Sequence, residues 1–323
     1  MFIVTGGAGF IGSAFVWKLN SEGIDNILIV DELDKSEKWK NLTNRRFVDY
    51  IHKDEFLKML SRDSLPFTIS KVIHMGACTS TTEQDADYLK QNNYYYTQTL
   101  AKWSLKKNIR FLYASSAATY GDGSEGFSDD DKTTLVLQPL NMYGYSKHLF
   151  DLWVLRNNLS QKMLGIKFFN VFGPNEYHKD DMTSVVFKAF CQIKKTGRVK
   201  LFKSYKPKYK DGEQVRDFIY VKDCVGAIWW FLKNREVNGI FNLGTGKARS
   251  WNDLAKAVFS AMGREPNIEY IEMPETIKPK YQYFTEAKME KFYSSGCPVR
   301  FLSLEDGIKD YVINYLQQED RYL

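Results

Sequence analysis

The chain opens with Met1–Gly12, MFIVTGGAGFIG, and this stretch decides how the rest of the sequence is interpreted. The apolar run at 2–4 is typical of a buried parallel strand, and three spaced glycines lead from it into a helical pattern. Gly6 allows a tight turn from strand to helix, Gly9 lets the backbone approach a pyrophosphate, and Gly12 lets the helix pack close to the sheet. The N-terminus of such a helix attracts phosphate through its unpaired N–H groups and its dipole. The stretch therefore predicts a dinucleotide site.

An acidic residue further along supports this prediction. The apolar run Ile27–Val30 ends at Asp31, roughly twenty residues beyond the glycines, where an acid meets the adenosine ribose in folds of this kind. Three glycines alone are equally typical of an ordinary turn. The strand before them and the acid after them therefore carry the prediction.

Composition places the chain among globular proteins. Its 323 residues are 44% apolar and 26% charged, which is long enough for two unequal domains or one domain with a substantial lobe. No run approaches the roughly 18 apolar residues of a membrane span, and the longest candidate, Ala227–Leu232, is predicted to be a core helix face. Because Met1 begins a strand at once, we expect no signal peptide.

Charge and cysteine content limit the partners. The net charge of +6 is spread along the chain, so we expect a solvated surface with a bias toward an anionic small molecule, and neither nucleic-acid nor membrane binding. The four cysteines lie far apart without metal-type spacing: Cys78, Cys191, Cys224 and Cys297. This pattern predicts reduced thiols in a cytoplasmic protein and no metal site.

Apolar strands alternate with helical patterns in the N-terminal half, which predicts an α/β fold with a doubly wound parallel sheet of the Rossmann type. The expected strands lie at 47–49, 72–74 and 111–115, the helices at 54–62, 83–107 and 143–158, and loops at 32–46, with a short helix, and 122–138. Phe241–Leu243 is expected to be the last strand of the sheet. We therefore predict a dinucleotide-binding domain of residues 1–171 and 217–243 and a smaller α/β substrate lobe of residues 172–216 and 244–323, with the substrate between them.

Three polar residues carry the predicted chemistry. Ser116 follows a strand directly, and Tyr143 and Lys147 are four residues apart on a predicted helix, hence on one face. A phenol becomes a usable base when a cation beside it lowers its pKa from about 10. Ser116 can hydrogen-bond the same substrate oxygen. Taken alone, Tyr143 and Lys147 would be interpreted as part of an ordinary helix face. The glycine turn upstream favours a catalytic role for them.

The motif Thr5-Gly6-x-x-Gly9-x-x-Gly12, with Ser116 and Tyr143-x-x-x-Lys147, resembles the extended short-chain dehydrogenases/reductases. Longer runs make the resemblance more specific, to the ADP-L-glycero-D-manno-heptose 6-epimerase family. They lie at 74–83, 113–121, 141–147, 169–174 with His178-Lys179, and 241–246, and the likeness covers essentially the whole chain.

The resemblance implies an isomerase that inverts carbon 6 of an ADP-linked heptose for the lipopolysaccharide inner core. It implies a bound NADP that oxidises carbon 6 transiently to a ketone, and a homo-oligomer, a pentamer in that family. Tyr143 matches one family base and Lys179 the other, although by sequence alone Lys179 is one more surface lysine. To act as a base, Lys179 would have to be desolvated or lie near another cation.

The resemblance also assigns binding residues. At the cofactor it places Gly6, Gly9, Phe10, Ile11, Gly12, Asp31, Glu32, Lys38, Lys53, Met75, Gly76, Ala77, Cys78, Thr79, Asn92, Lys147, Val171 and Lys179. At the substrate it places Ser116, Asn170, Asp181, Lys188, Phe202, Arg216 and Tyr281. Arg216 also suits a diphosphate by its chemistry, the alternative being a surface arginine before a strand.

Some positions depart from the family. Glu32 adds negative charge near the ribose, which opposes a 2′-phosphate and leaves NAD open, whereas Lys38 and Lys53 favour NADP. Met75 stands where relatives carry Glu, Asp181 where they carry Ser, and Lys188 where they carry His. Residues 203–214 are also longer and more basic than usual. These departures bear on the substrate pocket more than on the type of reaction.

Two other functions compete with the 6-epimerase. Another nucleotide-sugar enzyme, a carbon-4 epimerase or a dehydratase, would share the fold, but a dehydratase needs carboxylates where this chain has Ala117 and Ala118. A non-catalytic dinucleotide-binding sensor would be expected to lack Tyr143 and Lys147.

Overall fold

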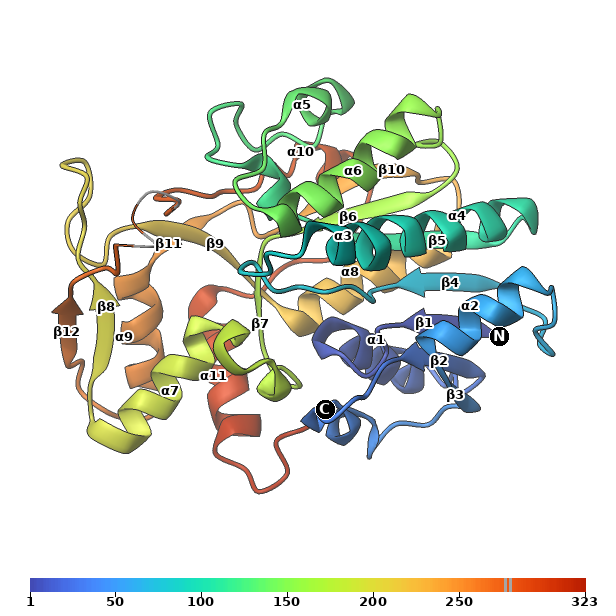
Figure 1. The fold of residues 1–323 in the computed structure, drawn as a ribbon. Helices are drawn as coiled ribbons and strands as arrows, with labels where there is room; N and C mark the ends of the chain where they lie inside the picture. Colours follow the sequence, from blue (N-terminus) through green and yellow to red (C-terminus); the bar gives the residue numbers. More distant parts are fainter. Residues whose placement is uncertain (276–277, 279–280) are drawn as a thin grey trace.

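A seven-stranded parallel sheet forms the centre of the computed structural model, which describes residues 1–275, 278 and 281–323 (Figure 1). The strand order is β10-β6-β5-β4-β1-β2-β3, and every neighbouring pair is parallel. The strands are β1 Phe2–Thr5, β2 Ile27–Asp31, β3 Asp49–His52, β4 Lys71–His74, β5 Arg110–Ser116, β6 Leu164–Phe168 and β10 Gly239–Leu243. The doubly wound sheet and the return of residues 241–243 as its last strand are confirmed.

Helices cover both faces of this sheet because its central strands are apolar on both sides. On one face, side chains from α2, α4 and α6 pack in one core cluster, and on the other α1 and α8 belong to a second, larger cluster. The helices of this part are α1 Phe10–Ser21, α2 Lys53–Ser61, α3 Ala86–Leu89, α4 Tyr96–Lys106, α5 Asp131–Val136, α6 Met142–Arg156 and α8 Val221–Lys233.

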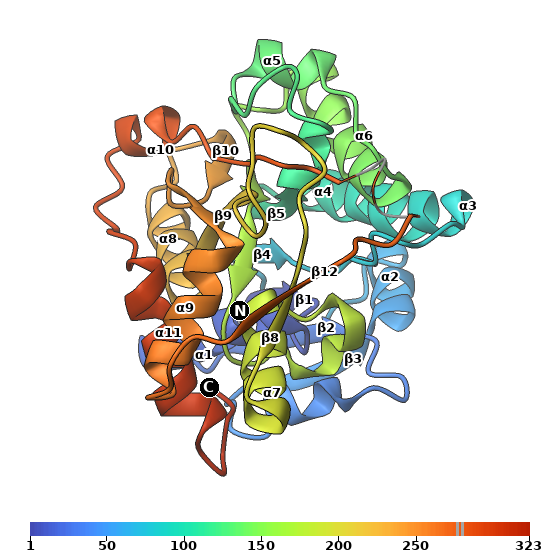
Figure 2. The ribbon, with the colours of Figure 1, turned by 90° about the vertical axis from the view of Figure 1, so that its left-hand side faces the viewer.

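A smaller lobe lies beyond the carboxyl ends of the central strands (Figures 1 and 2). It contains a three-stranded sheet of order β11-β9-β7 and a parallel pair of β12 with β8. Its strands are β7 Asn170–Phe172, β8 Val199–Phe202, β9 Val215–Tyr220, β11 Ala248–Ser250 and β12 Ile268–Ile271. Its helices are α7 Val185–Thr196, α9 Trp251–Ala261 and α11 Leu304–Tyr311, whereas α10 Glu290–Ser294 packs against β10 of the central sheet (Figure 1). The predicted second α/β lobe is therefore present, whereas the exact domain boundaries stay a prediction.

Three predictions of local structure are wrong in detail. The strand expected at 47–49 is β3, Asp49–His52, which pairs with Leu28–Asp31. The helix expected from 83 begins at Ala86, because the Asp85 side chain caps it by accepting the Tyr88 N–H, and residues 90–95 form a wider π-helical turn before α4. The loop expected at 122–138 contains α5, which its Asp- and Gly-rich flanks concealed.

Within the described ranges, no helix is long and apolar enough to span a membrane. Residues 227–232 lie in α8, with Ala227, Ile228, Phe231 and Leu232 fully buried, as predicted for a core helix. The four cysteines are free thiols.

Candidate active site

The turn between β1 and α1 has the shape that dinucleotide phosphates need. Gly6 has a φ of +65°, and a Cβ there would lie 2.5 Å from the backbone nitrogen of Gly76. A side chain at Gly12 would collide with the carbonyl oxygen of Gly6. Gly9 precedes α1 and leaves the first N–H groups of the helix without a side-chain cap. A backbone cradle that excludes Cβ atoms and presents free N–H groups fits a pyrophosphate.

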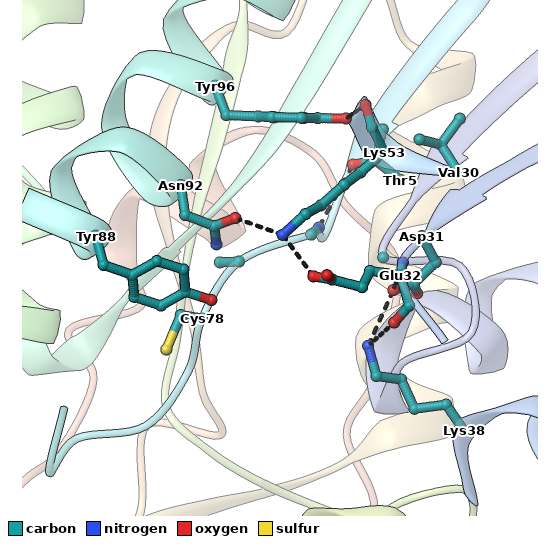
Figure 3. Close-up of a pocket in the computed structure, with 13 residues that line it drawn as sticks. Thr5, Val30, Asp31, Glu32, Lys38, Lys53, Cys78, Tyr88, Asn92 and Tyr96 are labelled. Atoms are coloured by element: carbon teal, nitrogen blue, oxygen red, sulfur yellow. Dashed lines mark hydrogen bonds and ion pairs between the residues drawn. The ribbon is translucent and has the colours of Figure 1, made fainter. Parts of the chain in front are cut away.

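A cavity lies beside this turn, at the carboxyl ends of β1, β2 and β4 (Figure 3). Its walls include the following predicted cofactor residues: Gly6, Asp31, Glu32, Lys38, Lys53, Gly76, Ala77, Cys78 and Asn92. Residues far apart in the sequence thus meet where open α/β sheets bind their ligands.

The part of this cavity next to the end of β2 holds two ion pairs. Lys38 Nζ lies 3.0 Å from Asp31 Oδ1, and Asp31 also accepts the N–H of Ala8 in the glycine turn at 2.9 Å. Lys53 Nζ lies 2.5 Å from Glu32 Oε2 and donates to Asn92 Oδ1 at 3.1 Å, so that it bridges two walls of the cavity (Figure 3). Burial opposes the charge of Lys53, but the carboxylate of Glu32 outweighs burial and raises the lysine's pKa. Each lysine is thus already matched by a carboxylate.

Ser116, Tyr143 and Lys147 come together at the carboxyl end of β5. Lys147 lies one turn beyond Tyr143 on α6, and its Nζ donates to the carbonyl oxygen of Ala114 in β5 at 2.8 Å. Burial lowers the pKa of Lys147 to about 8, against the opposing effect of Asp151. Burial raises the pKa of Tyr143, and a hydrogen bond with Ser116 acts in the opposite direction, so the expectation that a cation lowers the pKa of this phenol is wrong for this structure. A phenol with a hydroxyl partner and a buried amine on the same helix face has the components of a proton-transferring group.

Lys179 lies in a different element, the 3₁₀ turn Tyr177–Met182, but next to the glycine turn. Its Nζ lies 5.4 Å from the centre of the Phe10 ring, in the first residue of α1. Burial lowers the pKa of Lys179, the carboxylate of Glu176 raises it, and Lys188 lowers it further. Lys179 also lines a second cavity, which it shares with the predicted residues Asn170 and Val171.

Asn41 links the segment of Lys179 to the glycine turn. Its Nδ2 lies 2.8 Å from the carbonyl oxygen of Ala8, 3.1 Å from that of Asn175, and 3.3 Å from Nδ1 of His178. Asn41 is 2% exposed, so these contacts are shielded from water. The lysine is therefore held beside the turn by a buried amide and by its packing on Phe10.

Arg216 occupies the third part of the site. It lies within β9 with 7% of its surface exposed, so the alternative of a surface arginine before a strand is wrong. Its guanidinium lies 5.6 Å from the Trp251 ring and 5.2 Å from the Tyr281 ring, and it donates to the carbonyl oxygens of Val215 and Gln282. Burial lowers its pKa. Its partners among the described residues are carbonyl oxygens and aromatic rings, with no carboxylate in an ion pair, which leaves a buried cation suited to an anionic ligand.

The remaining predicted residues lie around these three places. Phe202 packs edge-on against Tyr281, with ring centres 6.5 Å apart. Lys188 Nζ donates to the carbonyl oxygen of Asp181 at 2.5 Å, and Asp181 itself is exposed. Met75 packs against the core, and Ile11 follows Phe10 in α1. Thr79 is exposed and does not line the first cavity.

Sequence reasoning missed several residues of both cavities. The first is also lined by Thr5, Val30, Tyr88 and Tyr96, and the second by Thr183 and Trp251 among others. The spacing of Tyr88 and Tyr96, eight apart and thus near one helical face, was a usable signal. Nothing local in the sequence connects Trp251 with Arg216, because the contact depends on the pairing of β9 with β11.

The comparison with known families agrees with this geometry. The sequence model of the NAD dependent epimerase/dehydratase family matches residues 2–244, which hold the glycine turn, the first cavity, Tyr143 and Lys179. The chain belongs to this epimerase/dehydratase family. A relative from Nitratidesulfovibrio vulgaris (strain DP4), described as ADP-L-glycero-D-manno-heptose-6-epimerase, is 60% identical over 323 residues, all of both chains.

Solved structures of the epimerase/dehydratase family share the architecture. The Helicobacter pylori ADP-L-glycero-D-manno-heptose-6-epimerase has a TM-score of 0.82 and 27% identity, covering 97% of this chain and 95% of that one. The Thermus thermophilus UDP-glucose 4-epimerase, solved in complex with NAD, has a TM-score of 0.76 and 25% identity, covering 96% and 97%. The dependence of the family on a nicotinamide dinucleotide accords with the cradle and the cavity described above.

Ser116→Ala is expected to lower kcat by roughly tenfold to a thousandfold without unfolding the protein, because a strand-end hydroxyl that orients a reacting oxygen acts mainly in the transition state. Steady-state kinetics with a thermal melt would measure this. Ser128→Ala, in the loop before α5, is the matched control and should keep the full rate. Unchanged turnover in the Ser116 variant would reduce Ser116 to a cap of the turn that follows β5.

Proposed function

We propose that the protein is the epimerase that converts ADP-D-glycero-D-manno-heptose to ADP-L-glycero-D-manno-heptose in lipopolysaccharide inner-core biosynthesis. The observation that carries this proposal is the full-length match to the relative from N. vulgaris. The site agrees with it, since two groups suited to proton transfer, Tyr143 and Lys179, come from different elements beside one dinucleotide cradle.

Inversion at carbon 6 requires oxidation to a ketone and reduction from the opposite face. When bound, the nicotinamide accepts the hydride of carbon 6 and gives it back. Tyr143 takes the hydroxyl proton of one epimer, with Ser116 as its hydrogen-bond partner and Lys147 one turn further along the same helix. Lys179 serves the hydroxyl of the other epimer, and its burial favours the neutral amine that a base requires.

The substrate's nucleotide fits the second lobe. Arg216 offers a buried guanidinium to the diphosphate, and Trp251 and Tyr281 beside it offer aromatic faces. Asn170 on β7 lines the second cavity between this lobe and the central sheet, together with Lys179. The sugar and the diphosphate of the substrate thus bind at neighbouring positions, the second cavity and Arg216.

The purified protein should convert ADP-D-glycero-D-manno-heptose to its 6-epimer without net consumption of cofactor. ¹H NMR of the heptose side chain identifies both epimers at equilibrium. UDP-glucose, presented in parallel, tests the alternative of a carbon-4 epimerase. Conversion of UDP-glucose with no change in the ADP-heptose would overturn the proposed substrate, and no reaction with either would favour the non-catalytic sensor.

NADP is the cofactor that we propose within this family. Lys38 and Lys53 lie at the adenosine end of the cavity, where a 2′-phosphate would meet two cations. Glu32 opposes the binding of NADP, because the carboxylate of Glu32 already pairs with Lys53. NADP must therefore draw Lys53 away from Glu32, whereas NAD need not.

Glu32→Gln is expected to raise the affinity for NADP relative to NAD by roughly tenfold, which corresponds to about 1.4 kcal/mol, because it frees Lys53 and removes a charge facing the 2′-phosphate. Calorimetric titration of cofactor-free protein with each dinucleotide gives the ratio. Glu37→Gln, which removes a surface carboxylate paired with Lys40, is the control. If the wild-type protein binds NAD as tightly as NADP, the NADP proposal is wrong.

Two further properties complete the proposal. Four free thiols suit a reducing compartment such as the cytoplasm. Assembly into a homo-oligomer stays a prediction from the family resemblance.

A further inference from the structure

A buried ion pair lies directly beneath the proposed catalytic residues. Lys167 Nζ on β6 is 2.8 Å from Asp151 Oδ2 on α6, and both side chains are 0% exposed. Removing two charges from water costs several kcal/mol each, and apolar residues of similar volume often stabilise a fold equally well. Stability alone therefore does not explain why the chain places this pair here.

The pair is the centre of a hydrogen-bonded cluster that connects α6 to two strands. Asp151 accepts the hydroxyl of Tyr113 at 2.9 Å and that of Ser115 at 2.7 Å, both on β5. Lys167 donates to Thr119 Oγ1 at 2.8 Å. Each charge is thus satisfied by fixed partners, so the three elements have one favoured arrangement.

Two short paths lead from this cluster to the site. On α6, Tyr143, Lys147 and Asp151 follow one another at intervals of four residues, so all three face the sheet. On the other path, Thr119 Oγ1 accepts a hydrogen bond from Lys167 Nζ and donates one to the backbone carbonyl of Ser116 at 2.8 Å. The pair is therefore connected to α6, which carries Tyr143 and Lys147, and to the end of β5, which carries Ser116.

We infer that the Asp151–Lys167 pair is a positioning device, which fixes Ser116 relative to Tyr143 and Lys147 without touching the substrate. The inference rests on the proposed function for its kinetic test. It assigns a role to two residues that the epimerase chemistry does not itself require.

The charge of Asp151 has a second consequence at Lys147. Around the ammonium of Lys147 lie Tyr143 and Asp151 on its own helix, and His74 and Cys78 on and after β4. Burial and then Lys147 itself lower the pKa of His74 to about 3, so His74 is neutral at physiological pH. Asp151 raises the pKa of Lys147 against burial. Beyond Asp151, the titratable groups of this cluster are His148 on α6, Lys167 on β6, Tyr113 on β5 and Tyr120, whose ring lies 5.0 Å from Lys167 Nζ.

Asp151→Asn keeps the size of the side chain and an acceptor oxygen but removes the charge. We expect kcat for the ADP-heptose to fall at least tenfold with KM changed less than about threefold, because alignment is lost and substrate contacts remain. Without Asp151 the pKa of Lys147 falls further, so the alkaline decline of kcat should move to lower pH. Glu would be too long for the site, so Asn is the conservative choice.

Asp310→Asn is a control with the same kinds of partner outside the proposed site, in a pair that is about one quarter exposed. Asp310 accepts the hydroxyl of Tyr220 at 2.6 Å and pairs with Lys222 at 2.8 Å, as Asp151 does with its own Tyr and Lys. A merely structural role for Asp151 would leave Asp151→Asn, like Asp310→Asn, with the wild-type kcat and pH profile, whatever stability each variant loses. That result would overturn the inference.

A second variant covers the case in which Asp151→Asn does not fold. Thr119→Val leaves the ion pair in place and removes only the hydrogen bonds of Thr119 to Lys167 and to Ser116. The kcat of Thr119→Val should fall several-fold, while the alkaline decline of kcat stays at the wild-type pH. A wild-type kcat would overturn the inference for the connection through Thr119.

A measurement without substrate separates this inference from the proposed function. The protein is labelled with ¹³C at lysine Cε. The NMR signal that is missing from the Lys147→Met variant belongs to Lys147, and its pH dependence gives the pKa of Lys147. Asp151→Asn should lower that pKa and Asp310→Asn should not. If the wild-type protein did not epimerise the ADP-heptose but the shift were found, the proposed substrate would fail and the effect of Asp151 on Lys147 would stand. An unchanged pKa of Lys147 in the Asp151→Asn variant would overturn the electrostatic part of the inference.

Discussion

Tyr143→Phe and Lys179→Met are each expected to slow epimerisation by roughly a hundredfold to ten-thousandfold, the range that positioned acid–base groups contribute. If the glycine turn holds the dinucleotide in one position, the two epimers would direct their hydroxyl groups to different sides, so each would need its own proton acceptor. Tyr143 belongs to α6 beside β5, whereas Lys179 belongs to the turn held against Phe10 and α1. Removing either group should stop inversion but leave one direction of hydride transfer.

The surviving half-reactions provide the sharper measurement. A truncated aldehyde analogue, which can be both oxidised and reduced in the site, should be processed by each variant through its remaining base. Lys194→Met, which removes an exposed lysine in the last turn of α7, is the control for Lys179→Met and should keep the wild-type rate. If Lys179→Met epimerised the full substrate normally, Tyr143 would serve both faces and the two-base mechanism would be wrong.

The central sheet and the glycine turn could be predicted because their signals are local. Apolar runs followed by glycines or an acid report strands that are buried on both faces, and Gly6 and Gly12 occupy positions where a Cβ would collide. Boundaries were less predictable. The start of α3 depends on a cap by Asp85, and the position of β3 depends on its register with β2.

The site was predictable where its residues lie in one element and not where separate elements meet. Tyr143 and Lys147 share a helix face, and Asp151 continues that face, so its position could have been noticed from spacing alone. Lys167, in contrast, reaches Asp151 only because β6 pairs with β5. Lys179 carries no local signal at all, since its surroundings are assembled by Asn41 and Phe10 from the N-terminal part of the chain.

Arg216→Met is expected to weaken substrate binding by roughly thirtyfold to several thousandfold, which corresponds to the 2–5 kcal/mol typical of losing one partner of a buried charge pair. The diphosphate would keep its charge in a buried place and lose the cation that offsets it. Arg216→Lys should recover part of the affinity, because it restores the charge but not the two-pronged hydrogen bonding of a guanidinium. Calorimetric titration with ADP, which carries the diphosphate but cannot react, measures binding apart from chemistry.

Arg249 provides the control within the same sheet. It lies opposite Arg216 in the pairing of β11 with β9, but its guanidinium is held by the carboxylates of Asp253 and Glu305. Because that charge is already matched and partly exposed, Arg249→Met should lower stability by about 1 kcal/mol or less and leave ADP affinity unchanged. Equal losses of affinity in both variants would indicate a general effect on the lobe. Wild-type affinity in a folded Arg216→Met protein would remove Arg216 from the diphosphate site, and its packing between Trp251 and Tyr281 would then be structural.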